Sequence, residues 1–395
     1  TPRIPLNIQP LPAMMAPFSN PDAFITIWDT RNVQYSKGTP LFPDERPRQD
    51  LRKPTSSQQI SLMIEGGPYT VYWMRLNNPS QRGQEGADGP FVLDLPTPGA
   101  YRLAILGAFH SFACENYGDA HKLLEVEQWG TTTWSSMYGA FQGARNMTLS
   151  ATDVPDLSEA ETTAHMFDGA RSFNAPLNHW DVSAIAHMAS MFDGARSFNQ
   201  DLDQWDTGAV HYMECMFRDA EHFNGAVGTW DVSNVYTLTS TFEGAHRFNQ
   251  PLNAWDVSNV TWMEHTFSEA LAFNQDLDQW DVQIVRSFWG FLSHAEAFNG
   301  AINGWNLRRA YNLRGLFYEA IAFNQPIADW TFGPRLDTME SMFEDATAFN
   351  QPLNAWEIPA SVDVTDMFKG AQSFDQDLSA WEADLASSKP DASSS

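Results

Sequence analysis

The stretch WDVSNVTWMEHTFSEALAFNQDLDQ, residues 255–279, decides the fold, because it is one copy of a unit that recurs along most of the chain. Its first Trp recurs with a period of 25 residues from Trp180 to Trp330, and again at Trp356 and Trp381 after one inserted residue. Self-similarity at a fixed period of this length is typical of a stacked repeat architecture. The repeats are therefore expected to bury a continuous core that no single copy could form alone.

Two further columns keep the same spacing and show where the array begins. A Phe-Asn pair recurs from residues 173–174 to residues 349–350, and a column of Ala accompanies it. Upstream, Trp129 and Pro155 each lie twelve residues before a Phe, as Trp255 does. The array therefore begins near residue 129 and comprises about ten turns.

Each unit changes its hydrophobic period once. Trp255-Asp256-Val257 alternates apolar, acidic and apolar residues, which predicts a short strand with Trp and Val facing the core. After Ser258 the apolar residues recur at steps of three and four, which predicts an amphipathic helix of about three turns. One strand and one helix per unit predict a right-handed α/β solenoid of the leucine-rich-repeat type, with a parallel sheet whose strands lie about 4.8 Å apart.

The chain before the array does not repeat. Short β-branched and aromatic runs at residues 24–28, 60–64, 69–73, 91–95 and 101–106 are separated by Gly- and Pro-rich turns, as at residues 66–68 and 96–99. This is the pattern of an all-β sandwich. The charge changes at the same place, since residues 1–128 carry 13 acidic and 11 basic side chains and residues 129–395 carry 36 and 12. We therefore predict an extended N-terminal segment (1–21), a β-sandwich domain (22–128), the repeat solenoid (129–385) and a disordered Ser-rich tail (386–395).

Composition excludes several classes of protein. The net charge of −26 disfavours nucleic-acid binding, because a polyanion does not hold a phosphate backbone. No run approaches the eighteen or so apolar residues that a membrane-spanning helix needs, so no membrane-spanning segment is expected. Cys114 and Cys215 are too few for a disulfide framework or a four-ligand zinc site.

The sequence contains no signature of catalysis. The motifs GxSxG, HExxH and CxxC are absent, as is a phosphate loop ending in Gly-Lys. The 10 His residues are scattered, and those in the array occupy different positions of the unit. The sequence therefore predicts a protein that is not an enzyme and holds no cofactor, apart from the Ca²⁺ alternative considered next.

A column of acidic residues is the candidate binding site. Each lies between two inward-facing residues of the predicted strand, so its carboxylate should point outward from the sheet face. These carboxylates could accept hydrogen bonds at the start of the following helix, bind a hard cation such as Ca²⁺, or recruit a basic partner, and capping is the favoured role. The column comprises Asp181, Asp206, Asp231, Asp256 and Asp281, with Asp201, Asp203, Asp276 and Asp278 as weak metal candidates nearby.

The other recurring columns are interpreted as structural. The Trp, Phe and Met columns keep core spacing and outnumber what a ligand needs, so we favour a core over a stacking platform for a sugar or base. The Asn that follows each Phe is expected to be buried and to hydrogen-bond backbone groups at a turn.

The segments MFDGARSFNAPLNHWDVS (166–183) and TFEGAHRFNQPLNAWDVSNVTWM (241–263) resemble the BspA-like family of leucine-rich-repeat surface proteins, in the class with the motif WDVSxVTxMxxMFxxAxxFNQxLxx. Residues 122–147, KLLEVEQWGTTTWSSMYGAFQGARNM, resemble the stretch that joins a PKD-like β-sandwich to such repeats. The resemblance covers about residues 100–385. The chain departs from the motif at Leu292, at Gly333-Pro334 and at Asp375. No catalytic residue belongs to the motif.

The resemblance implies a secreted or surface-displayed protein. We therefore expect a non-enzymatic binding or adhesion protein whose repeat surface recognises a protein or glycan on another surface. The alternative is a structural building block or decoration protein of a virion, appendage or surface layer, which would form a homo-oligomer or a larger assembly. A monomer in native solution would favour adhesion, and a symmetric or filamentous particle would favour the building block.

Overall fold

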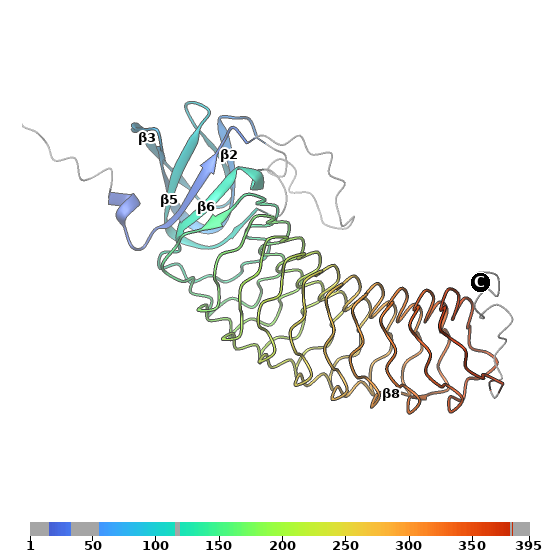
Figure 1. Ribbon diagram of the computed structural model, residues 1–395. Coiled ribbons are helices and arrows are strands. Elements are labelled where there is room, and N and C mark those ends of the chain that lie inside the picture. The colour runs from blue at the N-terminus through green and yellow to red at the C-terminus, as the bar shows by residue number, and fades with distance from the viewer. Residues whose placement is uncertain (1–15, 33–54, 115–118, 380, 382–395) are drawn as a thin grey trace, which may run out of the picture.

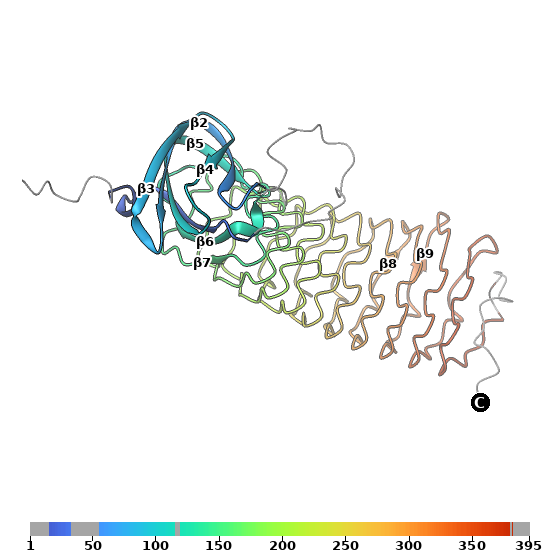
Figure 2. The same ribbon diagram turned by 90° about the horizontal axis from the view of Figure 1, so that it is seen from above.

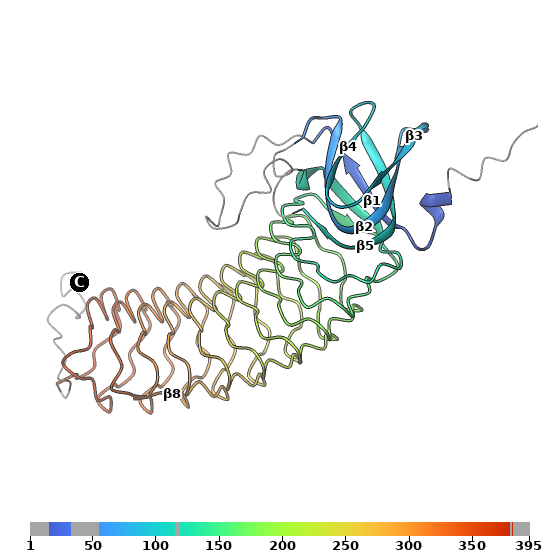
Figure 3. The ribbon, with the colours of Figure 1, turned by 180° about the vertical axis from the view of Figure 1, so that it is seen from behind.

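The computed structural model describes residues 16–32, 55–114, 119–379 and 381. A curled β-sheet lies against one end of a long stack of coils (Figure 1), and the view from behind shows the same continuous body (Figure 3). Within the predicted extended segment, Ala16–Ser19 form a short 3₁₀ helix, η1, and residues 1–15 lie outside the described residues. The predicted Ser-rich tail also lies outside them.

The front of the chain forms an antiparallel β-sheet, as the short β-branched and aromatic runs predicted. Its strands lie in the order β3-β2-β5-β1-β6-β7, and β4 pairs with β2 beside this path. All pairs are antiparallel except β6 and β7, which join the sheet to the stack in parallel. The elements are β1 (Phe24–Asp29), β2 (Gln59–Arg75), β3 (Asn78–Ala87), β4 (Phe91–Asp94), β5 (Ala100–Ala113), η2 (Ala120–Lys122), β6 (Leu123–Gln128) and β7 (Thr148–Leu149).

The sheet curls because β2 is one long strand. The sequence predicted two runs, residues 60–64 and 69–73, as separate strands of a sandwich, but β2 continues through both. Its first part pairs with β4 and its second part with β3, and its pairing with β5 shifts register around Gly66. Seen from above, the strands wrap around an interior at the end of the stack (Figure 2). The strands therefore form one bent sheet, whereas the predicted sandwich would consist of two separate sheets.

Each coil of the stack is a succession of tight turns. In the coil that begins at Trp230, the amide of Thr241 donates to Leu238 O at 3.1 Å, three residues earlier. Ser240 and Gly244 have φ of +54° and +67°, in the left-handed region. Such residues redirect the chain twice in each coil, so a right-handed helix cannot continue through them.

Alternate amides bind the next coil. Ser240 N donates to Glu264 O at 2.8 Å, and Phe242 N donates to Thr266 O at 2.9 Å. An α-helix would direct these amides to carbonyls four residues earlier. The predicted helix of about three turns is therefore wrong, and the part of the chain that the structure describes contains no α-helix. Consecutive turns bury residues at steps of three and four, so their hydrophobic pattern matches that of an amphipathic helix.

The predicted strand position is also largely wrong. Among the described residues, Trp-Asp-Val positions contribute only β8 (Asn306–Leu307) and β9 (Thr331–Phe332), which pair in parallel. The parallel bridges between successive coils lie instead seven residues after the column Trp, as between Thr237 and Trp262, or eight in the coil that begins at Trp330. The predicted side-chain directions are nevertheless confirmed, since Trp255 and Val257 are buried and Asp256 is exposed.

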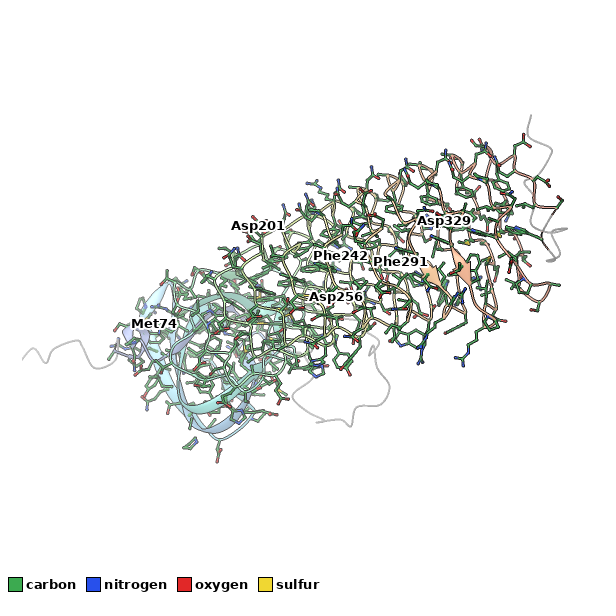
Figure 4. The ribbon with its side chains drawn as sticks, turned by 90° about the horizontal axis from the view of Figure 1, so that it is seen from below. Met74, Asp201, Phe242, Asp256, Phe291 and Asp329 are labelled. Atoms are coloured by element: carbon green, nitrogen blue, oxygen red, sulfur yellow. The ribbon has the colours of Figure 1, made fainter. Side chains whose placement is uncertain are left out.

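The aromatic columns form the interior of the stack, as predicted. The ring of Phe242 lies 4.0 Å from that of Phe248 in its own coil and 5.6 Å from Phe217 and Phe267 in the adjacent coils, nearly parallel to all three. Figure 4 shows Phe242 and Phe291 within the body of the stack, and both are fully buried. The stacking-platform interpretation of these columns is thereby excluded, because no ligand reaches the rings.

Polar side chains in the columns bond along the stack. The indole Nε1 of Trp255 donates to Val227 O at 3.1 Å, and each Trp from Trp205 to Trp381 in this column makes the same contact. Asn249 Oδ1 accepts from Asn274 N at 2.9 Å, one rung of a ladder that runs through the Asn column. The predicted backbone contact of the Asn is confirmed, but its burial is wrong, since the column lies at an exposed or half-buried edge.

The front sheet covers the first coil. Phe24 of β1 stacks on Trp129 with ring centroids 5.9 Å apart, and Phe112 of β5 lies 5.9 Å from Phe141. Ser111 forms a parallel bridge with Ser136. One hydrophobic core therefore runs from Phe24 into the stack without a break, and the sheet shields the apolar end that a terminal repeat would otherwise expose.

Candidate functional site

The five column aspartates lie on the outer surface of successive coils. Each accepts a hydrogen bond from the backbone N–H two residues later, at 3.0–3.2 Å. This is the local capping that the sequence favoured, but it closes a turn and not the start of a helix. The predicted sheet-face placement also differs, because the inter-coil bridges lie six residues farther along each coil. The structure thus gives every column aspartate a local structural role.

The carboxylates of adjacent coils are close. A Cβ built at Gly208 would lie 3.4 Å from Asp206 Oδ1 and 3.5 Å from Asp231 Oδ2, so this glycine lies between two members of the column. The Ser233 amide donates a hydrogen bond to Asp231 Oδ1 at 3.0 Å. Like charges on neighbouring coils therefore face the same solvent layer.

The weak metal candidates act as hydrogen-bond acceptors between coils. Asp201 Oδ1 accepts from Ala226 N at 2.9 Å, and Asp276 Oδ1 accepts from Ala301 N at 2.8 Å. Asp203 and Asp278 accept from the side chains of Asn178 and Asn253 at 2.7 and 2.9 Å. Within the described ranges, no three His, Cys, Asp or Glu side chains converge where a metal could bind.

Hydrogen bonds should keep Asp181 ionised into the acid range. The Ser183 hydroxyl donates to Asp181 Oδ1 at 2.6 Å and lowers the pKa of Asp181 below its ordinary value of 3.8, with help from the Ser183 amide. Because the folded pKa is below the unfolded one, this contact stabilises the fold at neutral pH and is lost as pH falls through the folded value. We expect Ser183→Ala to raise the pKa of Asp181 in an NMR titration. An unchanged pKa would show that the hydroxyl does not hold the carboxylate in solution.

The column should also make stability depend on salt. Carboxylates about 4.8 Å apart repel by about 0.9 kcal/mol even at the dielectric constant of water, and screening within about 3 Å at 1 M salt removes most of this repulsion. We expect the thermal midpoint to rise between about 0.05 and 2 M NaCl, and to rise less in Asp231→Asn. A saturable rise of the thermal midpoint with Ca²⁺ that Asp231→Asn abolishes would indicate a cation site. A midpoint that changes with neither NaCl nor Ca²⁺ would contradict the prediction.

Sequence reasoning missed a second surface, beside the inter-coil bridges. At least one ring per coil lies on the outer side over six successive coils, at positions six, seven or nine after the column Trp. These positions differ from coil to coil, so no single column repeats, and a search for periodic signals passes over them. The only available signal was the presence of aromatic residues at otherwise polar positions. We call this set the aromatic strip: His187, Tyr212, Tyr236, Trp262, Trp289 and Tyr311.

A hollow of about 210 Å³ lies where the front sheet meets the first coil. In its wall, His110 Nδ1 lies 2.7 Å from Ser135 Oγ, at an exposed position. The Ser135 amide also donates to His110 O at 2.9 Å, so the two residues tie β5 to the first coil. The hollow is small, and the surface of the stack is the larger candidate for binding a macromolecule. No helix in the described part of the chain is long and apolar enough to cross a membrane.

Comparison with protein families identifies the repeats. The family model described as "Mycoplasma protein of unknown function, DUF285" matches three overlapping stretches, residues 135–250, 223–330 and 291–391. Neither a curated protein nor a solved structure matches the chain. The three stretches together cover nearly all of the stack and more than half of the chain. The chain therefore belongs to the DUF285 family of repeat proteins.

Proposed function

We propose that the protein is a non-enzymatic, extracellular or surface-displayed binding protein, and that the stack presents the surface that recognises a macromolecular partner. The observation that carries this proposal is the contrast between interior and surface. The buried columns repeat in every coil, whereas the exposed residues beside the inter-coil bridges differ from coil to coil. A regular frame with a non-repeating surface provides many side-chain combinations on one extended face, as solenoid binding proteins do.

The same proposal includes the finer classification. Stacked coils, parallel bridges and the motif of residues 241–263 support a solenoid of BspA-like, leucine-rich-repeat type. The front sheet, which resembles a PKD-like domain in its junction sequence, is the element proposed to attach the protein to its surface. Its nearly balanced charge suits docking, while the stack carries most of the net charge of −26.

The proposal is tested on the full chain in native solution. Sedimentation velocity should give a monomer of 44.4 kDa, and the immobilised protein should retain at least one polysaccharide or extracellular protein saturably and without turnover. A symmetric or filamentous particle that retains neither kind of ligand would contradict the proposal and support the structural building block.

A further inference from the structure

We infer that the aromatic strip is a binding platform for an extended, uncharged polysaccharide that runs along the axis of the stack. This inference rests on the proposed binding function and specifies its surface and its ligand class. It concerns exposed rings and not the buried aromatic columns.

The rings of the strip are exposed although the interior is well packed. Tyr212, Tyr236, Trp289 and Tyr311 keep 37, 44, 44 and 38% of their surface accessible. They are four of the nine exposed large hydrophobic side chains among the described residues, and they lie on four of six successive coils. Isolated exposed apolar residues are ordinary, but an aligned set marks an interaction surface.

Neighbouring side chains hold these rings in place. His187 and Tyr212 stack at 4.8 Å with planes 5° apart, and Tyr236 contacts Tyr212 edge-to-face at 5.9 Å. The Arg286 guanidinium lies 5.9 Å from the centre of the Trp262 ring. His265 supports Trp289 at 4.8 Å. Because the rings are already ordered, a ligand that stacks on them loses little side-chain entropy on binding.

The arrangement of the rings fits a linear ligand. At least one ring lies on each coil from the one that begins at Trp180 to the one that begins at Trp305, and successive parallel segments lie about 4.8 Å apart. The strip is therefore long and narrow. A chain of sugar rings in extended conformation can contact several coils at once.

The charge of the strip selects an uncharged ligand. At the positions six, seven and nine after each of these six Trp residues, the formal charges are Glu214, Glu264, Arg286 and Arg314, which sum to zero. The rest of the stack is strongly acidic, so a polyanion would be repelled at long range, while a basic partner would be drawn to the aspartate column. The electronegative faces of Tyr and Trp attract the electropositive C–H groups of a sugar ring, and the polar side chains between them can hydrogen-bond its hydroxyls.

Affinity electrophoresis of the full chain tests the inference, with hydroxyethyl cellulose, galactomannan and laminarin as neutral probes and dextran sulfate as the polyanion. At least one neutral probe should retard the protein, and dextran sulfate should not. Tyr236→Ala/Trp289→Ala should weaken retardation by about tenfold, while Tyr236→Phe/Trp289→Phe should retain most of it. The matched control is Leu271→Ala/Ile321→Ala, which removes two similarly exposed apolar side chains, 36 and 45% accessible, each sixteen residues after its column Trp, and should change nothing.

Three results would overturn the inference. These are no retardation by any neutral probe, equal retardation of the alanine variant and wild type, and equal losses in the strip variant and the matched control. Saturable binding of a protein ligand through the strip, with no glycan retained, would overturn the polysaccharide while leaving the proposed binding function in place. Thermal midpoints of all variants separate lost binding from lost folding.

Discussion

Phe242→Ala is expected to lower the free energy of unfolding by about 3–5 kcal/mol, because it removes a fully buried ring and leaves a cavity. The Phe242 ring contacts Phe248 at 4.0 Å and the rings of two adjacent coils at 5.6 Å. Truncation therefore weakens three coils at once. Urea unfolding monitored by Trp fluorescence measures the loss.

A change at the end of the stack provides the comparison. Phe374 is only partly buried and contacts Phe368 and Phe349, and the described residues include no later coil beyond it. Phe374→Ala should therefore cost clearly less than Phe242→Ala, since stability in a stack is a sum of coils and nearest-neighbour contacts. Phe242→Leu, which keeps most of the volume, should cost under about 1.5 kcal/mol. Equal losses at the centre and the end would argue against the stacked account.

Lys122→Met is expected to cost about 3–5 kcal/mol, because it leaves a buried carboxylate without its partner. Lys122 and Asp119 have no accessible side-chain surface, and their charged atoms lie 2.7 Å apart. Lys122 Nζ also donates to Thr55 Oγ1 at 2.8 Å and to two backbone carbonyls. Asp119 accepts from Ser61 N at 2.7 Å. The pair thus fixes the start of β2 to the segment before β6.

The cost arises from the unpaired partner and not from the strength of the pair. Burial lowers the pKa of Lys122, and the attraction of Asp119 opposes this only in part. Asp119→Asn/Lys122→Met, which removes both charges, should therefore lose less stability than Lys122→Met alone. Urea unfolding of the two single variants and the double variant gives the coupling energy. A loss below about 1 kcal/mol for Lys122→Met would show that the carboxylate finds water or another partner.

The interior of the stack could be predicted from the sequence because burial repeats with the chain. The positions of Trp255 and Phe267 are inward in every corresponding copy of the described residues, so their period alone identifies them. The backbone between them could not be predicted from that period, since successive turns and an amphipathic helix both bury residues at steps of three and four. The left-handed residues Ser240 and Gly244 prevent an α-helix from forming. The residue types at these two positions differ from coil to coil, so they give no uniform signal in the sequence.

The front sheet shows a different limit. Strands β1, β4 and part of β5 consist of β-branched and aromatic runs and were predicted at nearly their observed bounds. Strand β3, with the sequence NPSQRGQEGA, has no buried residue and was missed. It is an edge strand that pairs only with β2, so backbone hydrogen bonds hold it for the most part, and these leave no hydrophobic pattern in the sequence.

The two candidate surfaces, the aspartate column and the aromatic strip, also differ in how far the sequence predicts them. The aspartate column repeats, and the sequence therefore placed its members outward and gave them a capping role that the structure supports. The aromatic strip does not repeat, since its rings occupy three different positions of the coil. Only the structure shows that Tyr236 and Trp289 are both exposed, each keeping 44% of its surface accessible.

Hydrogen-bond scalar couplings measured by NMR test the central claim, that alternate amides bond between coils. A coupling is expected between the amide nitrogen of Phe242 and the carbonyl carbon of Thr266, because Phe242 N and Thr266 O lie 2.9 Å apart across adjacent coils. A second coupling is expected between the amide nitrogen of Phe267 and the carbonyl carbon of Phe291, which is also 24 residues later. A coupling from the Phe242 amide to the carbonyl of Leu238, four residues earlier, would instead indicate an α-helix and contradict the account.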